Sequence, residues 1–148
     1  MPKKHQLVPA VHLFIFNARK QLLMARRFNT GYEDGNYSVV AGHVEEHETV
    51  LEAARREAKE EAGIVIALET FQFLHVMHRR REKVHLPDRV DFFVAANAWE
   101  GELRNMEPNK CDELRWVELD QLPDNTVPYI REALRAIQIK NPFSEYGW

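Results

Sequence analysis

Apolar residues recur along the chain with two different periods, which predict strands and helices in one domain. Runs rich in Val, Ile, Leu and Phe that are bounded by polar or Gly-containing stretches are typical of strands. We predict strands at residues 7–16, 21–25, 37–41, 90–99 and 113–117, with one or two more within 64–77. The polar turn between the first two runs predicts that they form a hairpin.

Two further segments have the spacing of amphipathic helices. Residues 49–62 form the clearer one, because Thr49 and Glu52 have the spacing of a capping box and Gly63 follows where a left-handed residue ends a helix. Residues 127–139 carry apolar side chains along one helical face. Strands combined with two substantial helices predict an α/β domain in which the helices cover a sheet.

Composition narrows the class of protein. The chain has 148 residues, which suits a single domain over residues 1–148, and 45% hydrophobic residues exclude bulk disorder. The single Cys111 excludes a disulfide framework. No apolar run reaches the roughly 18–20 residues of a membrane span, and the N-terminus does not resemble a signal peptide. We therefore expect no membrane association and a cytoplasmic location.

The charge balance is slightly acidic, with 20 Lys and Arg against 23 Asp and Glu and a net charge of −3. Such a chain is a poor candidate for general nucleic-acid coating, and no DNA-binding module is expected. An anionic substrate would need a local source of positive charge. The densest basic run, residues 78–83, could meet a polyphosphate tail or RNA, but a solvated hairpin loop is the interpretation that we favour.

Three carboxylates gather near the end of the first predicted helix. Glu57, Glu60 and Glu61 share a face, and like charges three or four residues apart destabilise a helix by about 0.2–0.5 kcal/mol per pair. Arg56 can pair with Glu60, whereas Glu57 and Glu61 have no basic partner within the helix. The cluster therefore needs either a cation such as Mg²⁺ or Mn²⁺, which prefer oxygen ligands, or basic residues from elsewhere in the fold.

The same helix carries a motif that resembles the Nudix box, Gly-x5-Glu-x7-Arg-Glu-U-x-Glu-Glu-x-Gly-U, in which U is a bulky aliphatic residue. The matching residues are Gly42, Glu48, Arg56, Glu57, Ala58, Glu60, Glu61, Gly63 and Ile64. Every spacing fits, although Ala58 is smaller than the usual residue. The resemblance to the Nudix family implies an α/β fold, namely an α/β/α sandwich with a central mixed β-sheet, and a hydrolase that acts on a nucleoside diphosphate linked to another moiety.

The resemblance also implies which residues act. It places Mg²⁺, with Mn²⁺ as a substitute, on Glu57, Glu60 and Glu61, and it adds the backbone carbonyl of Ala41 as a ligand. Glu57 and Glu61 would be the main ligands. A carboxylate would then take the proton of the attacking water.

The other box residues and the general base complete this assignment. Arg56 would orient the carboxylates, while Gly42, Glu48 and Gly63 would be structural. The base stays open among Glu57, Glu60 and a later acidic residue. The candidates for that later acid are Glu107, Asp112 and Glu113.

Two residues outside the motif are candidates for substrate binding. Arg26 ends the second predicted strand, where MutT-like Nudix proteins use an Arg to contact phosphate. Asn125 resembles an Asn that such proteins present to a purine base, but a turn or helix-capping role is the alternative that we favour.

Several substrates fit this resemblance. A nucleoside triphosphate cleaved to monophosphate and pyrophosphate is the leading expectation. ADP-ribose, dinucleoside polyphosphates and the 5′ end of RNA are alternatives. A nucleotide sensor without catalysis is a further alternative, which the complete set of box carboxylates disfavours. The sequence leaves the oligomeric state open, a homodimer included.

Overall fold

The computed structural model describes residues 1–148 without a break. The strands are β1 (Leu7–Ile15), β2 (Leu22–Arg27), β3 (Tyr37–Ser38), β4 (Val40–His43), β5 (Gln72–Arg79), β6 (Asp88–Ala96), β7 (Cys111–Val117) and β8 (Phe143–Tyr146). The helices are α1 (Val50–Ala62), the 3₁₀ helix η1 (Leu68–Thr70) and α2 (Pro128–Gln138). Both long helices lie where the sequence predicts them.

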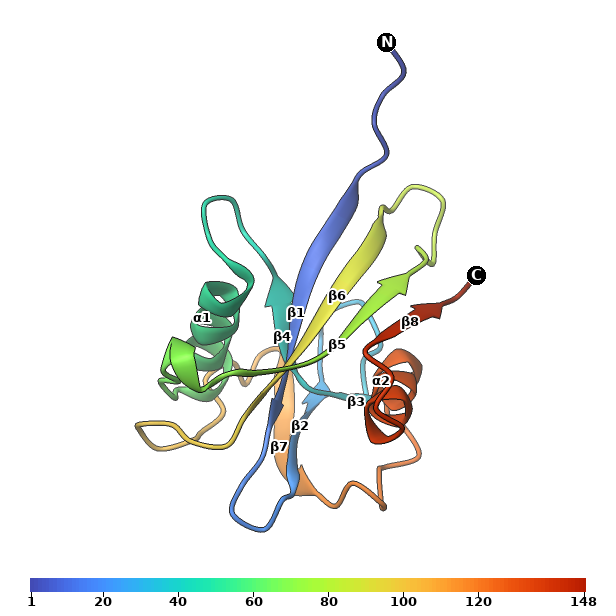
Figure 1. The fold of residues 1–148 in the computed structure, drawn as a ribbon. Helices are drawn as coiled ribbons and strands as arrows, with labels where there is room; N and C mark the ends of the chain where they lie inside the picture. The colour runs from blue at the N-terminus through green and yellow to red at the C-terminus, as the bar shows by residue number, and fades with distance from the viewer.

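The strands form two sheets. The larger is mixed, with the order β4-β1-β6-β5-β8, and its β1–β6 and β5–β8 pairs are parallel. The smaller has the order β3-β2-β7 and is antiparallel. Helices α1 and α2 lie on opposite sides of the larger sheet (Figure 1). The predicted sandwich with a central mixed sheet is confirmed, and the second sheet is an addition to it.

The chain passes from one sheet to the other at two places, one predicted as a hairpin turn and the other as a single strand. The predicted hairpin of the first two strands is wrong, because β1 and β2 belong to different sheets and meet only at the Phe16–Leu22 bridge. The Asn17 side chain accepts hydrogen bonds from the backbone of the turn and stabilises it. The predicted strand at 37–41 is likewise two strands, one in each sheet, with Val39 between them.

The C-terminal strand β8 has no counterpart in the predictions. It extends the larger sheet by pairing in parallel with β5. The fully buried His75 on β5 fixes this edge, because its Nδ1 donates to the carbonyl of Asn141 over 2.8 Å and its Nε2 lies 2.6 Å from the hydroxyl of Ser144. The segment 64–77, predicted as one or two strands, contains η1 and most of β5.

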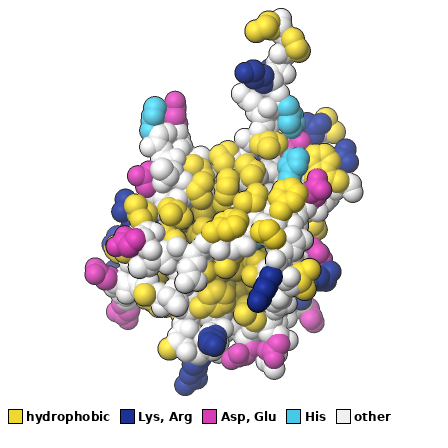
Figure 2. Space-filling model, viewed as in Figure 1, with side chains coloured by type: hydrophobic (Ala, Val, Ile, Leu, Met, Phe, Trp, Pro, Cys, Tyr) yellow, Lys and Arg dark blue, Asp and Glu magenta, His cyan; other side chains and the backbone are white.

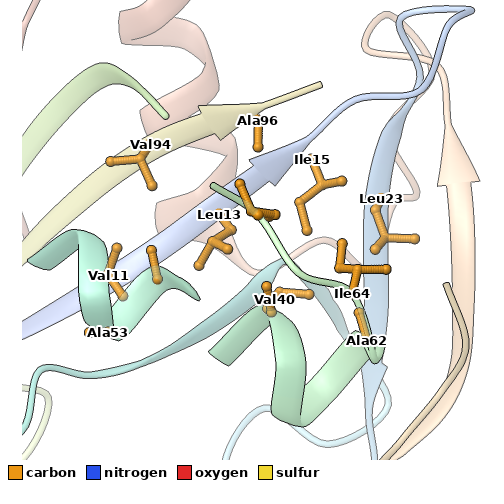
Figure 3. Close-up of a cluster of buried hydrophobic side chains, with 13 residues drawn as sticks. Val11, Leu13, Ile15, Leu23, Val40, Ala53, Ala62, Ile64, Val94 and Ala96 are labelled. Carbon is orange, nitrogen blue, oxygen red and sulfur yellow. The ribbon is translucent and has the colours of Figure 1, made fainter. Parts of the chain in front are cut away.

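Alternation along β1 divides the hydrophobic core in two. Val11, Leu13 and Ile15 face α1 (Figure 3), whereas Phe14 packs on the α2 side. The α1 side of the core includes four fully buried alanines of the helix, namely Ala53, Ala54, Ala58 and Ala62. Their small side chains let α1 lie close to the sheet, which explains why position 58 holds an Ala rather than a larger aliphatic residue.

One face of the molecule has apolar and charged side chains in different places. In the view of Figure 2, hydrophobic side chains gather over the middle of the face and charged ones lie around its rim. None of the helices has the length and apolar character that a bilayer crossing would need.

Candidate active site

The N-terminal cap fixes where α1 begins, and therefore where its carboxylates lie. Thr49 Oγ1 accepts a hydrogen bond from the Glu52 backbone over 3.1 Å, and the Glu52 carboxylate accepts one from the Thr49 backbone over 2.8 Å. The helix ends at Gly63, whose φ of 70° is left-handed. The predicted cap and stop are both confirmed. They bring Glu57, Glu60 and Glu61 onto the last two turns.

Arg56 is the centre of the ion pairs at this site. Its guanidinium donates two hydrogen bonds to Glu48, over 2.7 and 3.1 Å, and one to Glu57 over 2.7 Å. The expectation that Glu57 has no basic partner within the helix is therefore wrong. It also reaches Glu60 at 3.3 Å and the carbonyl of His43 at 3.0 Å. The hydrogen bond from Arg56 lowers the pKa of Glu48. Arg56 thus contacts three of the nearby carboxylates, while its role in orienting them and the structural role of Glu48 stay predictions.

Glycine is required at position 42 by close approach. The buried Glu57 carboxylate lies against the backbone of Gly42, so that a Cβ atom there would overlap Glu57 Oε1. Strand β4 thereby acts as a wall against which α1 presents its carboxylates.

Glu61 contacts the same strand one residue earlier. Its Oε2 accepts a hydrogen bond of 3.1 Å from the Ala41 backbone N–H. Burial, and then the negative charge of Glu57, raise the pKa of Glu61 well above its usual range, and burial also raises the pKa of Glu57. The structure thus brings Ala41 to the carboxylates through its N–H, while the predicted use of its carbonyl as a metal ligand stays a prediction.

These groups line a cavity of about 540 Å³, which we call the acidic cavity. Its charged lining residues are Arg26, Arg27, Glu45, Arg56, Glu57, Glu60, Glu61, Glu107 and Lys110. The oxygen donors suit Mg²⁺ or Mn²⁺, because a divalent cation would relieve the unfavourable proximity of Glu57 and Glu61. No three acidic or imidazole side chains already converge as a ligand set.

Arg26 lies at this cavity, but two acids hold it. Its Nε donates to Asp112 over 2.7 Å and its Nη2 lies 3.6 Å from Glu113. The hydrogen bond that Arg26 donates to Asp112 raises the pKa of Arg26. Of the three late acids left open by the sequence, Glu107 is therefore the one that lines the cavity without an arginine partner. Phosphate contact by Arg26 stays a prediction.

Asn125 does not line the acidic cavity. Its side chain donates to the carbonyl of Gly35 over 2.7 Å, and its own carbonyl accepts from the Tyr37 backbone. Val127, rather than Asn125, is the N-cap of α2, and no side chain caps that helix. Asn125 thus joins two loops, and the base contact expected for it stays a prediction.

A second cavity of about 480 Å³, which we call the basic cavity, lies on the other side of β4. Its charged and aromatic lining residues are His12, Arg27, Tyr32, His43, Arg79, Arg80, Arg81, Glu82, Arg89 and Tyr129. Arg27 and Ala41 line both cavities. The basic run at residues 78–83 signalled part of this cavity, but β1, β2, β4, β6, α2 and the intervening loops supply the rest.

A buried carboxylate supports the floor of the basic cavity. Asp91 is fully buried and accepts hydrogen bonds from Arg79 Nε over 2.7 Å and His12 Nε2 over 3.0 Å. Burial alone would raise the pKa of Asp91, but these hydrogen bonds outweigh it and lower the pKa to about 2. Tyr129 lies under the Arg79 guanidinium, with 3.9 Å between the guanidinium carbon and the ring centroid.

Comparisons with known proteins test the resemblance that the motif suggests. The family profile described as the NUDIX domain matches residues 6–137. The chain is 27% identical to an RNA pyrophosphohydrolase of Novosphingobium aromaticivorans, over 87% of this chain and 88% of that protein. It is similar in structure to a MutT NUDIX hydrolase from Burkholderia pseudomallei, with a TM-score of 0.78 and 27% identity over 88% of this chain and 98% of that one. A MutT protein from Methanosarcina mazei Go1 shares the fold, with a TM-score of 0.76 and 17% identity over 95% and 99% of the two chains. The resemblance drawn from the motif is confirmed, and the chain belongs to the NUDIX family.

Proposed function

We propose that this Nudix hydrolase cleaves a nucleoside triphosphate to the monophosphate and pyrophosphate, with Mg²⁺ as cofactor and Mn²⁺ as a substitute. The observation that carries the proposal is the set of three carboxylates, Glu57, Glu60 and Glu61, that one helix presents to a cavity also lined by Arg27 and Lys110. Acidic residues on one wall suit the metal, and basic residues elsewhere in the lining suit phosphate oxygens.

The residues divide the chemistry between them. A bound Mg²⁺ would neutralise charge on the phosphoryl oxygens and lower the pKa of a bound water. Arg56 donates a hydrogen bond to the Glu57 carboxylate and the Ala41 N–H donates one to that of Glu61, so both carboxylates would be held in place to bind the metal. The side chain of Glu60 is 53% exposed and has only a 3.3 Å contact with Arg56, which leaves it accessible to water.

We therefore assign Glu60 as the general base. Its carboxylate takes a proton from water, and the resulting hydroxide attacks the α-phosphorus. The bond from that phosphorus to the bridging oxygen breaks, and pyrophosphate leaves. Glu107 is the alternative base, because it also lines the cavity.

The experiment is a substrate panel with purified protein. We expect pyrophosphate release from at least one nucleoside triphosphate in the presence of Mg²⁺ and none after chelation. Tight nucleotide binding without turnover at any metal concentration would favour the sensor alternative instead. Glu69→Gln, an exposed carboxylate outside both cavities, is the matched control for the charge changes at Glu57 and Glu61.

A second candidate is removal of pyrophosphate from the 5′ end of RNA. The relative named RNA pyrophosphohydrolase favours it, since it aligns over 87% of this chain. Triphosphorylated oligonucleotides therefore belong in the same panel, together with ADP-ribose and dinucleoside polyphosphates.

A further inference from the structure

The basic cavity is lined by more positive charge than the uncharged sugar and base of a nucleotide would need for binding. Arg27, Arg80, Arg81 and Arg89 line it, and none of their guanidinium groups forms an ion pair, although the Arg81 backbone N–H donates to the Asp88 carboxylate over 2.8 Å. Its only acidic lining residue is Glu82, whose carboxylate already accepts a hydrogen bond of 2.7 Å from the Tyr32 hydroxyl. Four unpaired guanidinium groups around one cavity repel one another, and an anion would relieve that repulsion.

Hydrogen bonds hold one of these four side chains, Arg27, in place. Arg27 Nε donates to the carbonyl of Tyr32 over 2.6 Å, and its Nη2 donates to Thr30 over 3.1 Å. The Arg79–Asp91 pair beneath them is buried and fixed by His12. This part of the cavity is therefore preorganised, which reduces the entropy lost when a ligand binds.

The C-terminal segment fixes the far edge of the same cavity. The Arg80 backbone N–H donates to the carbonyl of Tyr146 over 2.9 Å, and the Arg80 guanidinium lies 5.6 Å from the Trp148 ring. Trp148 in turn donates from Nε1 to the carbonyl of His78 over 3.2 Å. Figure 2 shows Lys and Arg side chains at the upper right, where the connection between β5 and β6 lies in Figure 1.

The two cavities are neighbours, so one ligand can occupy both. Arg27 and Ala41 line each of them, and β4 forms the wall between. A nucleoside triphosphate whose phosphates lie in the acidic cavity would present only its sugar and base to the basic one. Arg80, Arg81 and Arg89 line the basic cavity alone, so their guanidinium groups would then have no anion to bind, although their planar donors match a phosphate.

We propose that the basic cavity binds a phosphate group on the 3′ side of the same nucleotide whose 5′ pyrophosphate linkage is hydrolysed at the carboxylates. The proposal rests on the proposed function. The shared chemistry is a 3′-phosphate, which two sources supply: a mononucleotide with a free 3′-phosphate, or an RNA chain, where it is a phosphodiester.

The test compares matched substrates with the intact chain and Mg²⁺. The panel contains guanosine and adenosine 5′-triphosphate, the same nucleotides with a 3′-phosphate, and 5′-triphosphorylated dinucleotides and trinucleotides. We expect kcat/KM to be at least about tenfold higher for substrates with a 3′-side phosphate, the size of one charge-assisted hydrogen bond. Preference for the mononucleotides or for the oligonucleotides identifies the source, and either preference supports the proposal.

Variants assign the preference to the cavity. In Arg81→Gln and Arg89→Gln, the ratio of kcat/KM with and without the 3′-phosphate should fall by at least about threefold, and in the double variant toward one. Arg55→Gln, at an exposed position on α1 outside both cavities, should keep the wild-type ratio. Circular dichroism and a thermal melt establish that each variant is folded.

The outcomes separate the two proposals. No hydrolysis of any substrate would overturn the proposed function. Hydrolysis with equal kcat/KM for matched pairs would leave that function standing and overturn the 3′-phosphate site. A preference that survives both arginine substitutions would also overturn the assignment to this cavity.

Discussion

Two carboxylates on either side of β4, Asp91 and Glu61, have opposite surroundings and opposite pKa shifts. Asp91 has no exposed surface, yet two donors surround it and its pKa falls to about 2. Glu61 has only the Ala41 N–H as a donor and Glu57 as a neighbour, and its pKa rises. A carboxylate that is fully satisfied supports structure, whereas one left without a cation nearby is suited to bind one from solution.

The largest expected effect tests the satisfied side of this comparison. Asp91→Asn leaves the buried Arg79 charge without its partner, which should lower the free energy of unfolding by about 3–5 kcal/mol, measured by urea denaturation. Asp112→Asn is the matched control, since it removes an exposed partner of Arg26 and should cost less than about 1 kcal/mol. Equal losses would contradict the distinction between buried and exposed pairs.

The second prediction tests the unsatisfied side through activity. Glu57→Gln and Glu61→Gln should each lower kcat/KM by at least about a hundredfold. Removal of one group that stabilises a transition state typically has an effect of this size. Glu69→Gln should match the wild type. If both variants kept full activity, the assignment of these carboxylates to the metal would be wrong.

Acid should weaken the contribution of Asp91. Its pKa is lowered on folding, so this stabilisation is fully present above the unfolded value near 3.8 and is lost as pH falls through about 2. The amount is about 2 kcal/mol. We expect the stability difference between the wild type and Asp91→Asn to narrow between pH 5 and pH 2.5. A constant difference would show that Asp91 does not titrate in this way.

The smallest effect has the opposite sign. Because the pKa of Glu61 is raised on folding, its ionised form destabilises the metal-free protein at neutral pH. Glu61→Gln should therefore raise the melting temperature without Mg²⁺. The gain in the free energy of unfolding should be at least the ~0.2–0.5 kcal/mol that like charges cost at this spacing. It should also reduce the rise in melting temperature that Mg²⁺ gives the wild type. A lower melting temperature in the absence of metal would contradict this account.

The two sides also differ in how far the sequence predicts them. Glu57, Glu60 and Glu61 lie within one helix, where spacing alone places them together. Arg27, Arg79 and Arg89 come from β2, β5 and β6, which belong to two different sheets and surround one cavity only after both sheets have formed. Nothing in the local pattern distinguishes these arginines from solvated ones at strand ends.

The same limit explains the missed features of the fold. The turn after β1 has the residues of a hairpin turn, and only tertiary packing directs β2 into the other sheet. Strand β8 is four residues long and pairs in parallel with a strand far away in the sequence. Both outcomes depend on contacts that local periodicity does not contain.

The close approach of Glu57 to Gly42 has a consequence for variation at that position. Every other amino acid carries a Cβ, and that atom would occupy the space of the Glu57 carboxylate. Substitution at position 42 would leave every charged residue of the acidic cavity in the sequence but would displace the Glu57 carboxylate. Position 42 therefore favours glycine because it has no side chain and not because of its backbone, since φ at Gly42 is not positive. A saturation library of the chain should show this glycine to be as intolerant of change as the carboxylates themselves.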